Sequence, residues 1–428
     1  MTVPPTEAST ALHTDHYELT MLDAALRDGT AEQRATFEVF TRHLPSGAHY
    51  GVFCGLGRLL DALERFRFGP DELEWLAARS IVSPPTLDWL AEYRFSGDID
   101  AFAEGELYGP DAPVITVDGT FGQAVLLETI VLSIVNHDSA VAAAGARIVA
   151  AAQDRPIIEM GSRRTDPEAA VAAARAAWIV GFASTSNLEA GRRYGIPTAG
   201  TAAHAFMLAY PTEQEAFAAQ VARLGAATTL LVDTYDTEGG IAHAVAAAGP
   251  GLGAIRIDSG DLADEARRAR VQLDRLGARS TRVIVTGDLD EAALAALAAA
   301  PADGYGVGTA VVMGGDRPTA GFVYKLVAIG APGGGDLRAV AKRSPGKEGV
   351  AGRKWAWRRF DPKHHHAIDD LVATDPAPPP GPSRPLQVPV VRGGVVVHRP
   401  PLDEVRAHHA AACDEWAAGT AMVVTHRP

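Results

Sequence analysis

AIRIDSGDLADEARRARVQLDRLGARSTRVIVTGD, residues 254–288, is the stretch of sequence that decides the fold class. An apolar run with β-branched side chains comes first, a helical stretch rich in alanine and charged residues follows, and a second apolar run closes it. A strand, a helix and a second strand in this order form a βα unit whose strands run parallel. The stretch therefore predicts an α/β protein built on a parallel sheet.

The same alternation of short apolar runs and helical stretches extends in both directions along the chain. Seven candidate strands share this pattern: 157–160, 179–183, 197–201, 229–233, 254–258, 282–286 and 304–308. Polar or glycine-rich residues follow every one of them. A closed barrel brings all such strand ends to one rim, whereas an open sheet brings together only those near its switch point. Because so many ends carry these residues, we expect a (β/α) barrel.

The regions that flank the alternating segment have a different composition and predict a second domain. Residues 1–112 mix helical and extended segments, which predicts an N-terminal α+β domain, and extended segments are also expected in about 340–428. The barrel domain is expected to span 113–339 and to carry the active site. The proline-rich stretch 372–385 predicts a stiff connector. The glycine pair Gly393-Gly394 between two valine-rich runs predicts a hairpin.

Overall composition excludes several classes of protein. The net charge of −13 and the pI of about 5.5 argue against a general binder of nucleic acid or of acidic membranes. Two cysteines are too few for a secreted disulfide framework or a cysteine-based zinc site. The first residues lack the pattern of a secretory signal peptide. Charges interrupt the alanine-rich runs before they reach the ~20 apolar residues of a membrane span. We therefore expect a soluble, cytoplasmic protein.

The strand end at 256–261 carries the densest set of chemical groups. Arg256, Asp258, Ser259, Gly260 and Asp261 follow one another just before a predicted helix. A helix cap formed by Ser259 or Asp261 is the structural alternative. An arginine, a second carboxylate and a glycine exceed what a cap needs, however. Helix N-terminal amides bind anions, and carboxylates bind ribose hydroxyls or Mg²⁺, so this turn predicts a functional site.

Three other strand ends carry residues suited to an anion. Gly287 and Asp288 in TGDLDE, and the glycine turn with Gly308 and Thr309 in GYGVGTA, resemble phosphate-binding turns of barrels. Glycines here also permit a tight turn without any ligand. In EMGSRR, Arg163 and Arg164 match the fork geometry of a carboxylate or phosphate, although surface arginines are often merely solvated. Together these ends predict a site for a sugar phosphate.

His204 is the single titratable residue in GIPTAGTAAHAF, residues 195–206. A histidine among alanines is commonly a satisfied core residue. Here the small neighbours leave the imidazole accessible to a bulky ligand. It then serves as a hydrogen-bond donor to phosphate, as a general acid, or as a nucleophile that accepts a phosphoryl group. The residues alone do not choose among these roles.

Nine motifs in a fixed order, spread over about residues 12–358, connect the chain to a known family. They are TDHYELTM, EMGSRR, GFASTSN, GIPTAGTAAH, LLVDTYDT, IRIDSGDL, TGDLDE, GVGT and VYKL. In these motifs the chain resembles the nicotinate phosphoribosyltransferases, especially the bacterial form. The resemblance implies a type II phosphoribosyltransferase fold, in which an irregular α/β barrel lies beside a domain made from the N-terminal region and the C-terminal part. It also implies a homodimer whose active sites lie at the subunit interface.

The resemblance further implies an activity. The family joins nicotinate to phosphoribosyl pyrophosphate, giving nicotinate mononucleotide and pyrophosphate, with Mg²⁺ and with ligase-type coupling to ATP hydrolysis. The reaction is the first step in the salvage of nicotinate into NAD. Small-molecule substrates, and neither nucleic acid nor membrane, are the expected partners.

Site residues are carried over by position in the matching motifs. His204 falls where the family has a phosphohistidine, and Asp258 and Arg256 fall at the catalytic strand end, with Asp258 a candidate ligand of Mg²⁺. The residues assigned to nicotinate are Tyr17 from the neighbouring subunit, Met160, Arg163 and Arg256. Those assigned to phosphoribosyl pyrophosphate and its phosphates are Ser259, Gly260, Asp261, Gly287, Asp288, Gly308, Thr309 and, from the second subunit, Lys342, Arg343 and Ser344.

Departures from the family pattern keep alternatives open. Met160 stands where many relatives have phenylalanine, TGDLDE replaces SNDLDE, and Ala310 follows GVGT. One alternative is a related enzyme that uses nicotinamide or quinolinate, although the pair Arg163-Arg164 favours an acidic base. Another is a non-catalytic sensor of pyridine nucleotides. An aldolase would need a lysine at a strand end, and none of the seven ends carries one.

Overall fold

A computed structural model describes residues 8–44, 48–331, 335–342, 349–363, 366–416 and 422–427. The chain divides into two compact units: unit 1 comprises Met1–Ala140 and Thr319–Pro428, and unit 2 comprises Val141–Pro318. The sequence placed these divisions at 112/113 and 339/340 instead. The difference arises because β5 (Ile115–Thr120) and β12 (Phe322–Ile329), expected in the barrel domain, pair with opposite edges of β1 (Arg34–Thr41) in unit 1.

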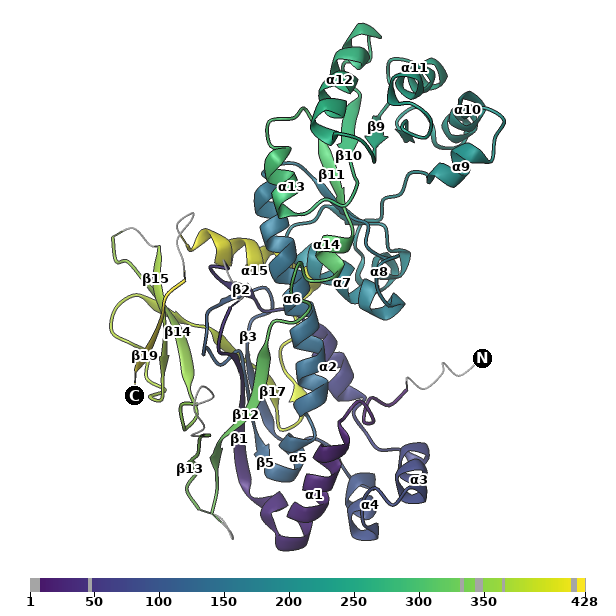
Figure 1. Cartoon of the computed structure of the whole chain (residues 1–428). Coiled ribbons are helices and arrows are strands. Elements are labelled where there is room, and N and C mark those ends of the chain that lie inside the picture. Colours follow the sequence, from purple (N-terminus) through teal and green to yellow (C-terminus); the bar gives the residue numbers. More distant parts are fainter. Residues whose placement is uncertain are drawn as a thin grey trace. The chain divides into compact units, whose positions relative to one another are not determined.

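Unit 1 is built around a largely antiparallel seven-stranded sheet (Figure 1). In sheet order its strands are β13 (Arg338–Ala339), β12, β1, β5, β3 (Asp98–Phe102), β17 (Gln387–Arg392) and β18 (Val395–Val396). Seven of the eight residues of β1 are buried, and Phe37 stacks on Tyr324 of β12 with ring centroids 4.8 Å apart. This strand is therefore the centre of the core of unit 1.

Helices and shorter strands complete the N-terminal part of unit 1. The helical elements are α1 (His16–Asp28), η1 (Thr30–Glu32), α2 (Leu56–Glu64), α3 (Pro70–Ala78), α4 (Pro84–Ala91) and α5 (Phe121–Val125). A two-stranded sheet pairs β2 (Gly51–Val52) with β4 (Leu107–Tyr108). The long helix α6 (Glu128–Ala152) begins in unit 1 and continues into unit 2.

The C-terminal part of unit 1 adds a four-stranded sheet and a helix. The sheet order is β16 (Ser383–Pro385), β14 (Trp355–Phe360), β15 (Ala367–Ala373) and β19 (Val424–Arg427), and the helix is α15 (Leu402–Asp414). β17 and β18 form the hairpin expected at Gly393-Gly394, where both glycines have positive φ. Part of the expected connector 372–385 is strand, because β16 pairs with β14 and β15 extends to Ala373.

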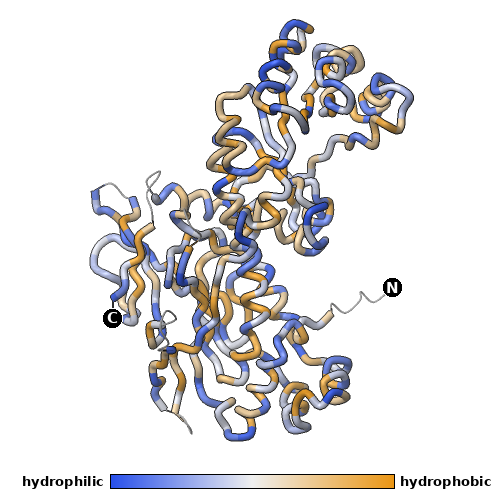
Figure 2. The backbone as a smooth tube through the Cα atoms, in the orientation of Figure 1, coloured by the Kyte–Doolittle hydropathy of each residue, from blue (hydrophilic) through white to orange (hydrophobic). Residues whose placement is uncertain are grey.

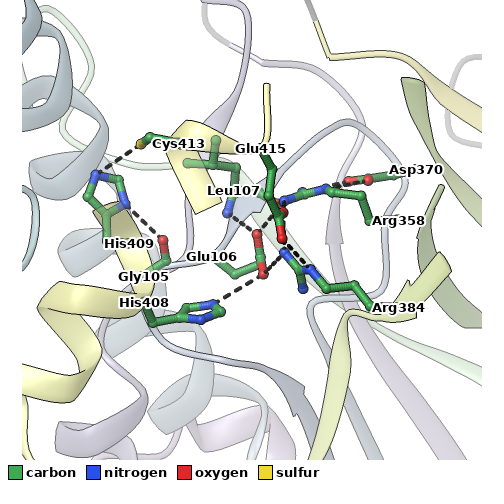
Figure 3. A network of polar contacts seen from close by, with 10 residues as sticks. All are labelled: Gly105, Glu106, Leu107, Arg358, Asp370, Arg384, His408, His409, Cys413 and Glu415. Atoms are coloured by element: carbon green, nitrogen blue, oxygen red, sulfur yellow. Dashed lines mark hydrogen bonds and ion pairs between the residues drawn. The ribbon is translucent and has the colours of Figure 1, made fainter. Parts of the chain in front are cut away.

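A buried network of charges fastens these C-terminal elements to the strand β4 region (Figure 3). Arg358 on β14 is fully buried and donates hydrogen bonds to Asp370 Oδ1 at 2.9 Å, Glu106 Oε1 at 2.7 Å and Glu415 Oε2 at 2.9 Å. Arg384 on β16 contacts the other Glu106 oxygen at 2.7 Å. Segments far apart in the sequence are therefore held together by ion pairs rather than by apolar contacts alone.

Unit 2 contains a six-stranded parallel sheet (Figure 1). In sheet order its strands are β7 (Ser184–Thr185), β6 (Ile157–Glu159), β11 (Gly304–Val307), β10 (Arg282–Val285), β9 (Ala254–Ile257) and β8 (Thr229–Leu231). The helices are α7 (Pro167–Ile179), α8 (Leu188–Tyr194), α9 (His204–Leu208), α10 (Glu213–Leu224), α11 (Thr237–Ala248), α12 (Leu262–Arg275), α13 (Glu291–Ala296) and α14 (Thr309–Val312). The predicted alternation of strand and helix is confirmed for most of this unit.

Two of the seven predicted strands differ in the structure. The apolar run 179–183 is wrong as a strand, because α7 continues to Ile179 and the chain turns at Gly181 (φ +117°) before β7 begins. The stretch 197–201 contributes only one bridge, between Thr198 and Thr185, since Pro197 has no N–H to donate. Within the described residues no pairing joins this stretch to β8. The sheet is thus an open half-barrel.

Hydropathy follows this architecture (Figure 2). Ile255 and Ile257 of β9 and Val283 and Val285 of β10 are completely buried, whereas the outer helix α12 is strongly polar. A sheet with buried strands and polar covering helices is the usual arrangement of parallel α/β units. No helix in the part of the chain that the structure describes combines the length and apolar character required to span a bilayer.

Candidate active site

One cleft of about 830 Å³ lies at the carboxyl ends of the parallel strands of unit 2. Its walls come from the segments that follow β6, β7, β9, β10 and β11, and from the stretch that leads into α9. The predicted site residues that line it are Met160, Arg163, His204, Arg256, Asp258, Gly287, Asp288, Gly308 and Thr309. Residues from strand ends as far apart in sequence as Met160 and Thr309 thus meet because parallel strands end at the same edge.

Ser259, Gly260 and Asp261 follow Asp258 but do not line this cleft. The Ser259 hydroxyl donates to Asp233 Oδ2 at 2.7 Å, and Asp261 accepts a hydrogen bond from the Asp264 backbone N–H at 3.2 Å. Asp261 is therefore the N-cap of α12, which corresponds to the capping alternative considered from the sequence.

The remaining predicted residues belong to unit 1 or fall outside the described residues. Tyr17 lies near the start of α1 with 44% of its surface exposed, and Lys342 follows β13 and is also exposed. Burial, with a contribution from the charge of Glu128, raises the pKa of Tyr17 to about 12, so its phenol is neutral at physiological pH. Arg343 and Ser344 lie outside the residues that the structure describes.

Arg256 and Asp258 form the central ion pair of the cleft. Arg256 Nη2 donates to Asp258 Oδ1 at 2.8 Å, and Arg256 Nε donates to Thr286 Oγ1 at 2.9 Å. The Thr286 hydroxyl in turn donates to the same Asp258 oxygen. Burial alone would raise the pKa of Asp258, but the bonds from Thr286 and Arg256 hold it below its ordinary value. Asp258 is therefore an ionised carboxylate.

The second oxygen of this carboxylate, Asp258 Oδ2, has no hydrogen-bond partner among the described residues, and the side chain is one-third exposed. The other guanidinium nitrogen, Arg256 Nη1, donates to Thr201 Oγ1 and to the Ala202 carbonyl oxygen, both at 3.3 Å. Arg256 thereby fixes the segment before His204 and leaves one carboxylate oxygen of Asp258 available to a ligand.

His204 begins α9, and its imidazole is 41% exposed in the same cleft. Its Nδ1 lies 3.1 Å from Thr234 Oγ1, and its Nε2 lies 3.9 Å from Asp233 Oδ1. The Asp233 side chain is only 2% exposed, and its Oδ1 accepts no hydrogen bond from any described residue. The Thr234 hydroxyl orients the ring from one side, and the Asp233 carboxylate lies beside the other nitrogen beyond hydrogen-bond distance. An oriented imidazole is suited to nucleophilic or acid–base catalysis.

Asp233, Thr234 and Thr286 were missed as site residues by sequence reasoning. Asp233 and Thr234 stand within LLVDTYDT, whose polar strand end was the available signal. Asp233 Oδ2 also accepts hydrogen bonds from the Asp258 backbone N–H at 2.8 Å and from Ser259. This carboxylate therefore connects the turn after β9 with the imidazole of His204.

Glycine at 306 makes room for the side chain of Met160. A Cβ atom at Gly306 would lie 2.7 Å from Met160 Sδ and 2.5 Å from Thr286 Cγ2. At Gly287, φ is +114° and a Cβ atom would lie 2.5 Å from the Asp258 carbonyl oxygen. Both glycines are thus required by close contacts around the cleft.

Arg163 and Arg164 follow Met160 and are exposed. Neither guanidinium forms an ion pair with a carboxylate of the described chain. Unpaired arginines in a concave site are suited to bind an anionic ligand through two parallel hydrogen bonds. The cleft therefore combines free cationic groups, one partly free carboxylate and an oriented imidazole.

Comparison with known proteins identifies the family of the chain. Residues 12–136 match the family model described as nicotinate phosphoribosyltransferase (NAPRTase) N-terminal domain. Nicotinate phosphoribosyltransferase pncB1 of Mycobacterium tuberculosis is 56% identical over 402 residues, which cover 91% of this chain and 88% of that protein. The chain belongs to the nicotinate phosphoribosyltransferase family.

Solved structures confirm the predicted fold of this family member. The crystal structure of human nicotinic acid phosphoribosyltransferase matches with a TM-score of 0.82 at 26% identity, over 96% of this chain and 97% of that one. Nicotinate-nucleotide pyrophosphorylase from Pyrococcus furiosus matches with a TM-score of 0.78 at 21% identity, over 97% and 98% of the two chains. The second likeness concerns the fold alone. The type II phosphoribosyltransferase fold expected from the resemblance is confirmed.

Proposed function

We propose that the chain transfers a phosphoribosyl group from phosphoribosyl pyrophosphate to nicotinate, forming nicotinate mononucleotide and pyrophosphate. The observation that carries the proposal is the cleft of unit 2 in which the Arg256–Asp258 pair, the unpaired Arg163 and His204 meet. The relative that is 56% identical is named for the same activity, which supports the proposal. We place the reaction in the salvage of nicotinate into NAD in the cytoplasm.

Each group has a distinct role in the displacement. The pyridine nitrogen forms a bond to the anomeric carbon of the ribose while the bond from that carbon to pyrophosphate breaks, through an oxocarbenium-like state. Arg163 binds the nicotinate carboxylate, and Met160 packs on one face of the base. Gly287, Asp288, Gly308 and Thr309 bind the ribose and its 5′-phosphate at the strand ends. The catalysis is thus electrostatic positioning more than proton transfer.

Asp258 is the candidate ligand for Mg²⁺. In the described residues no three His, Cys, Asp or Glu side chains are grouped to hold a metal ion by themselves. Mg²⁺ in phosphoryl and pyrophosphoryl sites is commonly held by one or two carboxylates plus substrate phosphates. The ionised Asp258 with its open Oδ2 fits this pattern. When bound, the ion would neutralise charge on the departing pyrophosphate.

ATP enters the proposal through His204. An imidazole nitrogen attacks the γ-phosphorus of ATP, the bond to ADP breaks, and the phosphohistidine so formed strengthens binding of phosphoribosyl pyrophosphate before water releases inorganic phosphate. Thr234 and Asp233 orient the ring for this step. We further propose a homodimer in which Tyr17, Lys342, Arg343 and Ser344 of one subunit complete the cleft of the other.

The first test compares bases and ATP dependence in one assay. Purified protein is given phosphoribosyl pyrophosphate and Mg²⁺ with nicotinate, nicotinamide or quinolinate, with and without ATP. We expect mononucleotide formation from nicotinate and its stimulation by ATP. Preferential use of nicotinamide or quinolinate would replace the proposed substrate, and binding without turnover of any base would favour the pyridine nucleotide sensor.

The second test separates the role of His204 from general damage to the fold. His204→Ala should abolish stimulation by ATP and leave a slower, ATP-independent turnover of nicotinate. His243→Ala is the matched control, because His243 is a partly exposed imidazole of unit 2 that pairs with Glu213 and does not line the cleft. ATP stimulation that survives in His204→Ala would disprove the phosphohistidine.

A further inference from the structure

A buried carboxylate directly precedes residues 160–164, the segment that brings Met160 and Arg163 to the cleft. Glu159 is the last residue of β6 and is 1% exposed. Its Oε1 accepts a hydrogen bond from the Gly161 backbone N–H, and its Oε2 accepts one from Thr185 Oγ1 at 2.5 Å. No Lys, Arg or His of the described chain forms an ion pair with it. Burial raises its pKa, which reflects the cost of an ionised carboxylate at this depth.

The bonds of Glu159 belong to a ring of hydrogen bonds that the backbone between Gly161 and Ser162 closes. Thr185 Oγ1 accepts from the Asn187 backbone N–H at 3.0 Å, so the hydroxyl proton is directed to Glu159. Asn187 Nδ2 donates to Ser162 Oγ at 3.0 Å. The ring therefore connects Gly161 and Ser162 to Thr185 and Asn187.

The segment held by this ring has little freedom of its own. A Cβ atom at Gly161 would lie 2.1 Å from Val312 Cγ1, so no other residue fits there without displacement. The Met160 N–H donates to the Val307 carbonyl oxygen at 2.8 Å. The backbone that carries Met160 and Arg163 is thus held by contacts on the side away from the cleft, while their side chains line the cleft.

We propose that Glu159 is a positioning residue that fixes segment 160–164 and thereby determines how firmly the enzyme holds the carboxylate of an acidic pyridine base. The proposal rests on the proposed function, in which Arg163 binds that carboxylate. Hydrogen bonds to a buried carboxyl group are strengthened by the low dielectric around it, so they hold the backbone that carries Arg163 in one position. A small misplacement of a binding group weakens its contribution many-fold.

The ring of hydrogen bonds does not include the residues assigned to the ribose phosphate. Gly287, Asp288, Gly308 and Thr309, which are assigned to the ribose phosphate, donate no hydrogen bond to the Glu159 carboxylate and lie after other strands. Loss of the Glu159 carboxylate should therefore weaken binding of the pyridine base much more than binding of phosphoribosyl pyrophosphate. A residue that merely stabilises the fold would not separate the two substrates.

The test uses Glu159→Gln and Thr185→Val in the full chain. A glutamine has one acceptor oxygen, so one of the two donors loses its partner, and the valine removes the hydroxyl that donates to Oε2. We expect KM for nicotinate to rise about tenfold in Glu159→Gln, with kcat and KM for phosphoribosyl pyrophosphate changing by about twofold or less. Glu213→Gln is the matched control, since Glu213 is a buried carboxylate of unit 2 outside the cleft.

Limited trypsin digestion supplies a measurement that does not depend on catalysis. Cleavage after Arg163 or Arg164 should be at least about threefold faster in Glu159→Gln than in the unaltered chain and in Glu213→Gln, because opening of the segment limits cleavage. Unchanged cleavage together with an unchanged nicotinate KM would overturn the proposal. Equal increases in both KM values would also overturn it, as would the same changes in Glu213→Gln. If the unaltered chain fails to use nicotinate, the proposed function fails, and the digestion alone then decides whether Glu159 holds the segment.

Discussion

Arginines of the two units differ in how their charges are matched. Arg358 of unit 1 is fully buried and contacts three carboxylates, whereas Arg163 and Arg164 of unit 2 are exposed and pair with no carboxylate of the described residues. Matched charges hold segments of the chain together. Unmatched charges at strand ends remain available to an anionic ligand. The pairing of an arginine, more than its presence, therefore distinguishes a structural residue from a binding one.

The carboxylates around Arg358 show what matching does to acidity. Burial alone would raise the pKa of Glu106, but the bond from His408 and the charges of Arg358 and Arg384 hold it well below its ordinary value. For Asp370, burial outweighs the attraction of Arg358 and raises the pKa to about 6. The network is therefore unevenly compensated, and removal of its one fully buried cation should be severe.

The largest effect is expected from Arg358→Met, which tests whether the matched arginine of unit 1 stabilises the fold. It leaves Glu106, Asp370 and Glu415 without their shared cation, and we expect the free energy of unfolding to fall by about 3–5 kcal/mol. Arg359→Met is the control, because Arg359 pairs with Asp369 at a partly exposed position and should lose about 1 kcal/mol or less. Urea unfolding of both variants measures the difference. Equal losses would show that burial of the pair has no special weight.

A second prediction concerns the unmatched arginines. Arg163→Ala should raise KM for nicotinate by about tenfold or more, because a charge-assisted contact to the carboxylate is lost. Its free energy of unfolding should stay within about 0.5 kcal/mol of the unaltered value, since no internal partner is left unpaired. Arg164→Ala, measured alongside, shows which of the two adjacent arginines faces the base. Unaltered nicotinate kinetics in Arg163→Ala would remove this residue from the base pocket.

A third prediction concerns Glu18, a buried carboxyl group that, unlike those around Arg358, forms no ion pair with a cation of the described residues. Glu18 of α1 is fully buried, and its oxygens accept hydrogen bonds from Thr14 and Thr129. Burial raises the pKa of Glu18 to about 7. The folded state therefore favours the neutral carboxyl, whose contribution to stability is complete below pH 4.5 and is lost as the pH rises to about 7.

Unfolding of Glu18→Gln at pH 5 and pH 8 checks this sign. The unaltered chain should lose more stability between these values than Glu18→Gln does, because glutamine has no proton to release. Glu92→Gln, at an exposed position, should keep the pH dependence of the unaltered chain. An identical decline in Glu18→Gln would place the titrating group elsewhere.

The fold could be predicted where local pattern and burial agree. The strands at 254–258, 282–286 and 304–308 are short apolar runs between polar turns, and each forms a strand in the sheet of unit 2. The run 179–183 is equally apolar, but its residues are the buried end of a helix and a turn. Apolar composition reports burial and does not by itself distinguish a strand from a helix end.

The candidate site could be predicted only as far as single strand ends. Arg256 and Asp258 stand out because several functional groups follow one strand. The role of Thr286 could not be predicted from the sequence, because it depends on the pairing of two neighbouring strands. That pairing brings Thr286 to Asp258, 28 residues away in the sequence. The bond between Arg358 and Glu106 spans 252 residues, and nothing local in either segment indicates it.

The absent side chain at Gly306 has a consequence for the history and redesign of this cleft. Because Met160 Sδ and Thr286 Cγ2 occupy the space that a Cβ at 306 would need, the identities of these positions are not independent. A larger residue at 306 becomes tolerable only after a compensating reduction at 160 and 286. Attempts to reshape the pocket for another heterocycle should therefore exchange these positions as a set.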